Sequence, residues 1–219
     1  AGEFSRAELL NKEFKIPRSF SLGTIFIERI LDAGTLLFFL LISLVMSTKV
    51  KTIIFEGPNI IYIIILILIL SGILIFQSSI FFTLKKFFKK KDKLRIVSII
   101  DNFSKSLNII KTKKKLFLII LLSFGLWSLI SVVYYLVMLT LSIGLPIYVS
   151  MFVVSMAAFG MIIPSSPGNL GVFHGVTMGA LLFFYPNKEE AFAFSVISHF
   201  IDFVPSVILG VISFLKIRI

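Results

Sequence analysis

Residues 147–185 read IYVSMFVVSMAAFGMIIPSSPGNLGVFHGVTMGALLFFY, two apolar arms separated by the break IPSSPGNLG at 163–171. The break contains two prolines, two glycines and an Asn, residue types that do not continue an α-helix. The arms have 17 and 14 residues and no Asp, Glu, Lys or Arg, whereas a full crossing takes about 20 residues. This pattern predicts a re-entrant hairpin whose tip lies within the membrane. An ordinary loop between two spans is the alternative.

Irregular backbone at membrane depth is tolerated only inside protein or beside a water-filled cavity. Amides at the start of the second arm would then point into that cavity and favour an anion such as phosphate. Discontinuous helices of this kind are typical of transporter sites. We therefore expect the break to bind substrate through Ser165, Ser166, Gly168, Asn169, Gly171 and, at the start of the second arm, His174.

The composition around this hairpin is that of a membrane protein. Of 219 residues, 58% are hydrophobic and 15% charged, against about 45–50% and about 25% in soluble domains. The 22 Lys and Arg exceed the 11 Asp and Glu, for a net charge of +11, but they lie between long apolar runs. That arrangement excludes a soluble enzyme, a disordered tail and a nucleic-acid-binding domain. It predicts an all-α, polytopic transmembrane helical bundle.

The chain is expected to form a single membrane domain over residues 1–219. Upstream residues are expected to precede it, because it begins at Ala1 without an initiator Met. With no Cys and only two His, we expect no metal site, no cofactor and no catalytic residue. The predicted segments are an interfacial segment at 1–23, transmembrane spans at about 24–48, 60–84, 116–141 and 191–215, a basic loop at 85–115 and the re-entrant hairpin at 147–185.

The basic loop at 85–115 holds 12 of the 22 Lys and Arg residues. Because cytoplasmic loops carry the excess of basic residues, this loop is expected to be cytoplasmic. Ile96, Phe103 and Leu107 recur in it at helical spacing. The loop is therefore also expected to contain an amphipathic helix that lies on an anionic lipid surface.

Three ionisable residues, Glu28, Arg29 and Asp32, occur within one turn or so of the first predicted span. A charge at the bilayer centre costs at least about 2.5–3.5 kcal/mol, so we expect these side chains to pair or to line a cavity. The alternative is that they lie at the cytoplasmic interface, where the cost is small.

His199 and Asp202 are three residues apart in the last predicted span. At that spacing they share a helix face and could form a hydrogen bond to each other. Such a pair serves either as a proton relay or headgroup contact, or as a structural pair that holds two helices together. Both interpretations remain open from the sequence.

Four stretches together resemble one family. They are GEFSRA at residues 2–7, IERILD at 27–32, IPSSPGNLGVFH at 163–174 and AFAFSVISHFIDFVP at 191–205. In this order they are similar to the flippase-like family that includes the transmembrane region of lysylphosphatidylglycerol synthase. The match begins partway into the family pattern, so the resemblance implies one or two upstream helices. One departure is His174, where many members carry Glu, and it argues against assigning an acidic role to this position.

The resemblance implies a multi-pass protein of the prokaryotic inner (cytoplasmic) membrane that moves a phospholipid or lipid-linked headgroup between leaflets. The alternative is a membrane subunit of an enzyme that synthesises or modifies a lipid, and a third hypothesis is a structural partner that recruits a synthase through the basic loop. Expected partners are membrane lipids, with a lipid synthase or a second copy as further candidates and no nucleic acid. The expected headgroup site combines the broken segment with Glu28, Arg29, Asp32, His174, His199 and Asp202.

Overall fold

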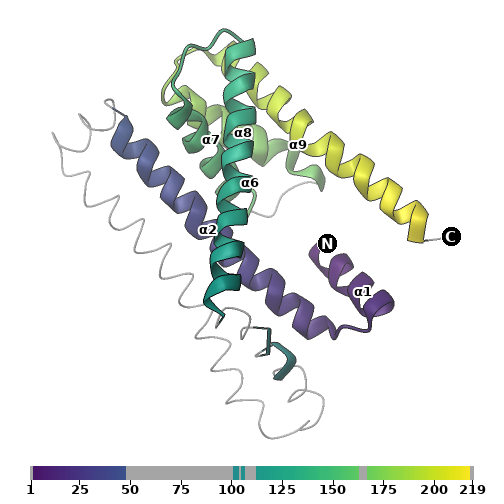
Figure 1. Ribbon diagram of the computed structural model, residues 1–219. Helices are drawn as coiled ribbons and strands as arrows, with labels where there is room; N and C mark the ends of the chain where they lie inside the picture. The colour runs from purple at the N-terminus through teal and green to yellow at the C-terminus, as the bar shows by residue number, and fades with distance from the viewer. Residues whose placement is uncertain (1, 48–100, 104, 107–111, 163–166, 218–219) are drawn as a thin grey trace, which may run out of the picture. The chain divides into compact units, whose positions relative to one another are not determined.

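The computed structural model describes residues 2–47, 101–103, 105–106, 112–162 and 167–217. This part of the chain is helical and contains no strand (Figure 1), which confirms the all-α prediction. The predicted span at 60–84, most of the basic loop, and Ser165 and Ser166 lie outside the described residues. The described elements are α1 (Gly2–Phe14), α2 (Arg18–Met46), α6 (Lys113–Thr140), α7 (Ile147–Gly160), the short 3-10 helix η3 (Pro167–Asn169), α8 (Leu170–Leu182) and α9 (Lys188–Ile217).

Three of these helices are long and apolar enough to cross a membrane: α2, α6 and the Lys188–Ser213 part of α9. Many of their large apolar side chains, such as Leu122, Phe200 and Leu209, are exposed on the chain. Extensive exposed apolar surface of this kind suits contact with lipid rather than water. α7 and α8 are shorter, with 14 and 13 residues, and whether they form a re-entrant hairpin stays a prediction.

The helices end where the sequence breaks them. After α6, Ser142 adopts a left-handed conformation with φ 57°, and Pro146 then takes an extended conformation as the N-cap of α7. In the broken segment, Gly168 has φ 79° and Asn169 has φ 55°, a region that Gly and Asn adopt most readily. These two left-handed residues turn the chain into α8.

The described residues form two compact units. The first contains the residues up to Thr35 and those from Asp101 to Gly125, and the second contains residues from Leu36 to Ser47 and from Leu126 onward. In the second unit α8 packs against both α7 and α9. Its buried core includes Tyr134, Met138, Val153, Phe173, Leu181 and Phe194.

In the first unit, ion pairs attach α1 to the beginning of α2. Arg18 donates a 2.8 Å hydrogen bond to Glu8, and Arg6 donates one of 3.1 Å to Glu28. A third pair joins Arg29 Nε to Glu3 Oε1 at 3.0 Å. The attachment of α1 is thus electrostatic, and it depends on carboxylates being ionised.

This attachment is expected to weaken in acid. The hydrogen bond from Arg18 holds the pKa of the Glu8 carboxyl below its ordinary value of 4.5. A carboxyl whose pKa is lowered by folding stabilises the fold above the unfolded pKa and stops doing so as the pH falls through the folded pKa. Hydrogen exchange of the α1 amides should be faster in Glu8→Gln than in the parent near neutral pH, and the difference should vanish as the pH falls through the lowered pKa of Glu8, below its ordinary value of 4.5. Glu13→Gln, on the same helix, should match the parent throughout. A Glu8→Gln variant that exchanges like the parent at neutral pH would contradict this expectation.

Candidate functional site

The second unit contains a cavity of about 320 Å³. The helices α6, α7, α8 and α9 and the broken segment all contribute to its wall, so the packing of several helices forms the cavity. Its lining is largely apolar and aromatic, with a few polar groups. The lining residues are Trp127, Ile130 and Tyr134 of α6, Val154, Ala157 and Ala158 of α7, Met161 directly after α7, Gly168 and Asn169 of η3, Phe173 of α8, and His199, Asp202, Phe203 and Ser206 of α9.

Asp202 and Tyr134 form the shortest polar contact of the cavity. The Tyr134 hydroxyl donates to Asp202 Oδ2 at 2.6 Å. The Tyr134 ring is buried and meets Phe194 edge-on, with ring centroids 5.8 Å apart. The packed ring therefore positions the phenol, and the phenol in turn positions the carboxyl group beside the cavity.

The two histidines meet across α8 and α9. His199 Nδ1 lies 3.2 Å from His174 Nε2, and His174 Nδ1 lies 3.3 Å from Ser195 Oγ. The Phe173 ring flanks His199, with centroids 4.7 Å apart. His199 lines the cavity, whereas His174 stands behind it and contacts His199. That both belong to one binding site stays a prediction.

His199 and Asp202, both among the described residues, do not hydrogen-bond to each other. Each one uses a partner from another helix, His174 for His199 and Tyr134 for Asp202. The bond that the spacing allows does not form, because spacing along one helix shows only which side chains share a face, whereas packing decides which polar partner is nearest.

The broken segment contributes two of its predicted residues to the cavity, Gly168 and Asn169. Asn169 is the N-cap residue of α8, although its side chain does not cap the helix. At Gly168 a Cβ would lie 3.3 Å from the Phe203 ring, so the segment approaches α9 closely. Gly171 lies on the exposed part of α8.

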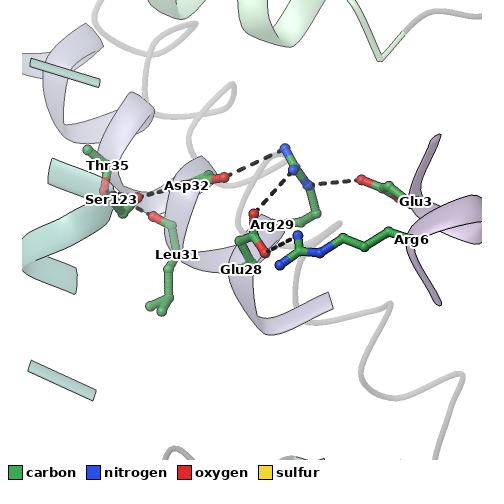
Figure 2. A network of polar contacts seen from close by, with 8 residues as sticks. All are labelled: Glu3, Arg6, Glu28, Arg29, Leu31, Asp32, Thr35 and Ser123. Atoms are coloured by element: carbon green, nitrogen blue, oxygen red, sulfur yellow. Dashed lines mark hydrogen bonds and ion pairs between the residues drawn. The ribbon is translucent and has the colours of Figure 1, made fainter. Parts of the chain in front are cut away.

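The other predicted residues, Glu28, Arg29 and Asp32, lie in the first unit, in a network of ionic contacts (Figure 2). Arg29 is near three carboxylates, at 3.0 Å from Glu3, 3.5 Å from Glu28 and 3.6 Å from Asp32. Figure 2 shows the Arg29 side chain reaching toward α1. The expectation that these charges pair is met, and their role in substrate binding stays a prediction.

Asp32 connects this network to α6. Its Oδ1 accepts a 2.6 Å hydrogen bond from the Ser123 hydroxyl, which lies 3.3 Å from that of Thr35 (Figure 2). The Asp32 side chain is 11% exposed, whereas Arg29 is 54% and Glu28 40% exposed. The network thus runs from a buried carboxylate to an accessible guanidinium.

Sequence reasoning missed Tyr134, Ser123 and Ser195 as partners of the predicted residues. Their partners lie 68, 91 and 21 positions away, so no local spacing reveals them. A signal did exist for Tyr134, since a tyrosine hydroxyl within an apolar span needs a hydrogen-bond partner. Among the described residues, no group of three or more His, Asp and Glu is placed to hold a metal ion.

Comparison with known proteins agrees with this helical membrane architecture. The family described as the lysylphosphatidylglycerol synthase TM region matches residues 1–210. A UPF0104 membrane protein of Methanocaldococcus jannaschii is 30% identical over 217 residues, which cover 97% of this chain and 88% of the relative. No solved structure matches the chain. The resemblance inferred from four short stretches is confirmed, and the chain belongs to the membrane protein family of the lysylphosphatidylglycerol synthase transmembrane region.

Proposed function

We propose that this protein moves a phospholipid or lipid-linked headgroup between the leaflets of a prokaryotic cytoplasmic membrane. The observation that carries the proposal is the cavity of the second unit, which has polar groups within a wall of apolar helices. A lipid crossing the bilayer needs such a place for its headgroup, because an unaccompanied charge in hydrocarbon is costly.

The size and lining of the cavity support this proposal. Ligand sites usually measure about 300–1,000 Å³ and combine apolar walls with a few convergent polar groups. Here the volume is about 320 Å³, and Asp202, His199 and Asn169 supply polar atoms of different character. A carboxyl, an imidazole and an amide can together contact both the phosphate and the substituent of a headgroup.

The exposed apolar faces of the same helices offer a surface for the acyl chains of the lipid. Phe200 and Leu209 of α9 and Leu129 of α6 are exposed on the chain. Acyl chains can remain against such surfaces in the bilayer while the headgroup occupies the cavity. Transport of this kind needs no covalent step.

The test is leaflet exchange in proteoliposomes that contain a short-chain fluorescent phospholipid, followed by quenching of the outer leaflet. We expect Asp202→Asn to slow exchange at least about tenfold, the effect of about 1.4 kcal/mol on a rate. Glu189→Gln is the matched control, since it makes the same chemical change at an exposed position of the same helix and should leave the rate unchanged.

Two outcomes would overturn the proposal. One is exchange by the parent protein no faster than in protein-free vesicles, and the other is a parental rate in Asp202→Asn. Mass spectrometry of the vesicle lipids distinguishes the alternative function. A covalently changed lipid would favour a membrane subunit of a lipid-modifying enzyme.

A further inference from the structure

Ser195, His174 and His199 form a continuous chain of polar atoms that ends at the cavity. The chain starts at Ser195 Oγ, passes through both nitrogens of His174 and reaches His199 Nδ1, with steps of 3.3 and 3.2 Å. Ser195 is fully buried and His199 is 7% exposed. The proposed transport of a headgroup does not by itself require such a chain.

The direction of each hydrogen bond follows from the serine. The Ser195 hydroxyl donates to the Phe192 carbonyl oxygen at 2.7 Å, so its only hydrogen is already used. His174 Nδ1 must then carry a hydrogen and donate to Ser195 Oγ. In a neutral imidazole only one nitrogen is protonated, so His174 Nε2 is an acceptor.

The same reasoning extends to the second imidazole. Because His174 Nε2 accepts, His199 Nδ1 must carry the hydrogen of the 3.2 Å contact. His199 Nε2 is then unprotonated in the neutral pair, and it is the ring nitrogen that His174 does not use. Adding one proton at Nε2 turns this acceptor into a cationic donor without breaking any bond of the chain.

We propose that His174 and His199 form a one-proton site that makes the cavity take up a proton together with an anionic phosphodiester group. This inference rests on the proposed function. It adds that the headgroup is a phosphodiester and that a proton enters the cavity with it. A second proton would place hydrogens on both facing nitrogens at 3.2 Å, so the pair holds only one. A phosphodiester that enters with one proton leaves the charge of the cavity unchanged, which avoids burying an uncompensated anion.

The surroundings of His199 contain few other groups that exchange protons. Asp202 on its own helix and Tyr134 on α6 line the same cavity, and His174 on α8 contacts His199 from behind the cavity. Among the described lining residues, α7 and η3 contribute none that titrates. Asp202 and Tyr134 are bonded to each other at 2.6 Å. The Asp202 carboxyl is the competing proton acceptor of the lining, so loss of proton uptake in His199→Gln is what assigns the proton to His199 Nε2.

The hydrogen-bond directions can be tested without any ligand. The chain has only two histidines, so the protein labelled with ¹⁵N-histidine in nanodiscs gives a simple imidazole spectrum. At alkaline pH we expect hydrogens on Nδ1 of both rings and unprotonated Nε2 atoms. A hydrogen on Nε2 of His174 would overturn the proposed chain.

Proton uptake is tested by calorimetry with dihexanoylphosphatidylmethanol, a phosphodiester with no other ionisable group. Titrations of the parent protein in buffers of different ionisation enthalpy should show about one proton taken up per ligand at a pH where the neutral pair predominates. Affinity should rise by up to about tenfold per unit fall in pH over that range. His199→Gln should bind more weakly and take up no proton.

His174→Gln is the matched variant, since its amide oxygen can still accept from His199 Nδ1. It should retain proton uptake with a shifted pH midpoint. Binding by the parent without proton uptake between about pH 5 and 8 would overturn this inference and leave the proposed function standing. Absence of binding at any pH would overturn it as well, while leaflet exchange by Asp202→Asn separately decides the proposed function.

Discussion

Gly160→Ala is expected to destabilise the packing of α7 against α8 by about 1–3 kcal/mol, the usual effect of overpacking a filled interior. A Cβ at this position would lie 2.8 Å from Cγ2, 3.0 Å from Cγ1 and 3.1 Å from Cβ of Val176. Because valine is branched at Cβ and has one strongly preferred rotamer in a helix, Val176 cannot rotate away. The helices themselves must separate, although alanine is otherwise the better helix former.

The measurement is unfolding in detergent, with Gly175→Ala as the control. Gly175 lies on α8, and a Cβ there meets nothing within 4 Å, so this variant should be neutral or more stable by up to about 1 kcal/mol. Adding Val176→Ala to Gly160→Ala should recover part of the lost stability. Equal stabilities of the two glycine variants would show that the close approach of α7 and α8 is wrong.

Tyr134→Phe is expected to cost about 1–3 kcal/mol of stability and to alter the cavity. The substitution keeps the ring that packs on Phe194 but removes the hydroxyl that donates to Asp202 at 2.6 Å. Asp202 is then left beside the cavity without its partner. The loss comes from an unsatisfied polar group rather than from packing.

Tyr135→Phe is the matched control, because it removes the same hydroxyl from the neighbouring residue, which lies outside the cavity lining. It should change stability by less than about 0.5 kcal/mol. A double-mutant cycle with Asp202→Asn measures the coupling directly. Additive effects of Tyr134→Phe and Asp202→Asn would contradict a bond between the two side chains.

The sequence predicted the fold class because its signals are local. Apolar runs of about 20 residues indicate transmembrane helices, and the Pro and Gly residues near 146 and 167 mark breaks that the structure also shows. The family was predictable for the same reason, since each motif is a short contiguous stretch. Helix type, helix breaks and family membership thus depend on neighbours along the chain.

The site was only partly predictable. The sequence singled out His174, His199 and Asp202 as ionisable or polar groups in apolar surroundings, and the structure places all three at or directly behind the cavity of the second unit. It could not show that Tyr134 bonds to Asp202 across 68 positions, or that the histidines bond to each other instead of His199 to Asp202.

By itself, then, the sequence determined that this is a helical membrane protein with ionisable residues in apolar segments. In lipid, each segment must hydrogen-bond its own backbone and find partners for its charged side chains, so these constraints act on each segment separately. Only the tertiary structure decided which polar groups face one another. Helix packing alone brings α6, α8 and α9 within hydrogen-bond distance at Tyr134–Asp202 and His174–His199, and a shift of one helical turn would give every one of these groups a different partner.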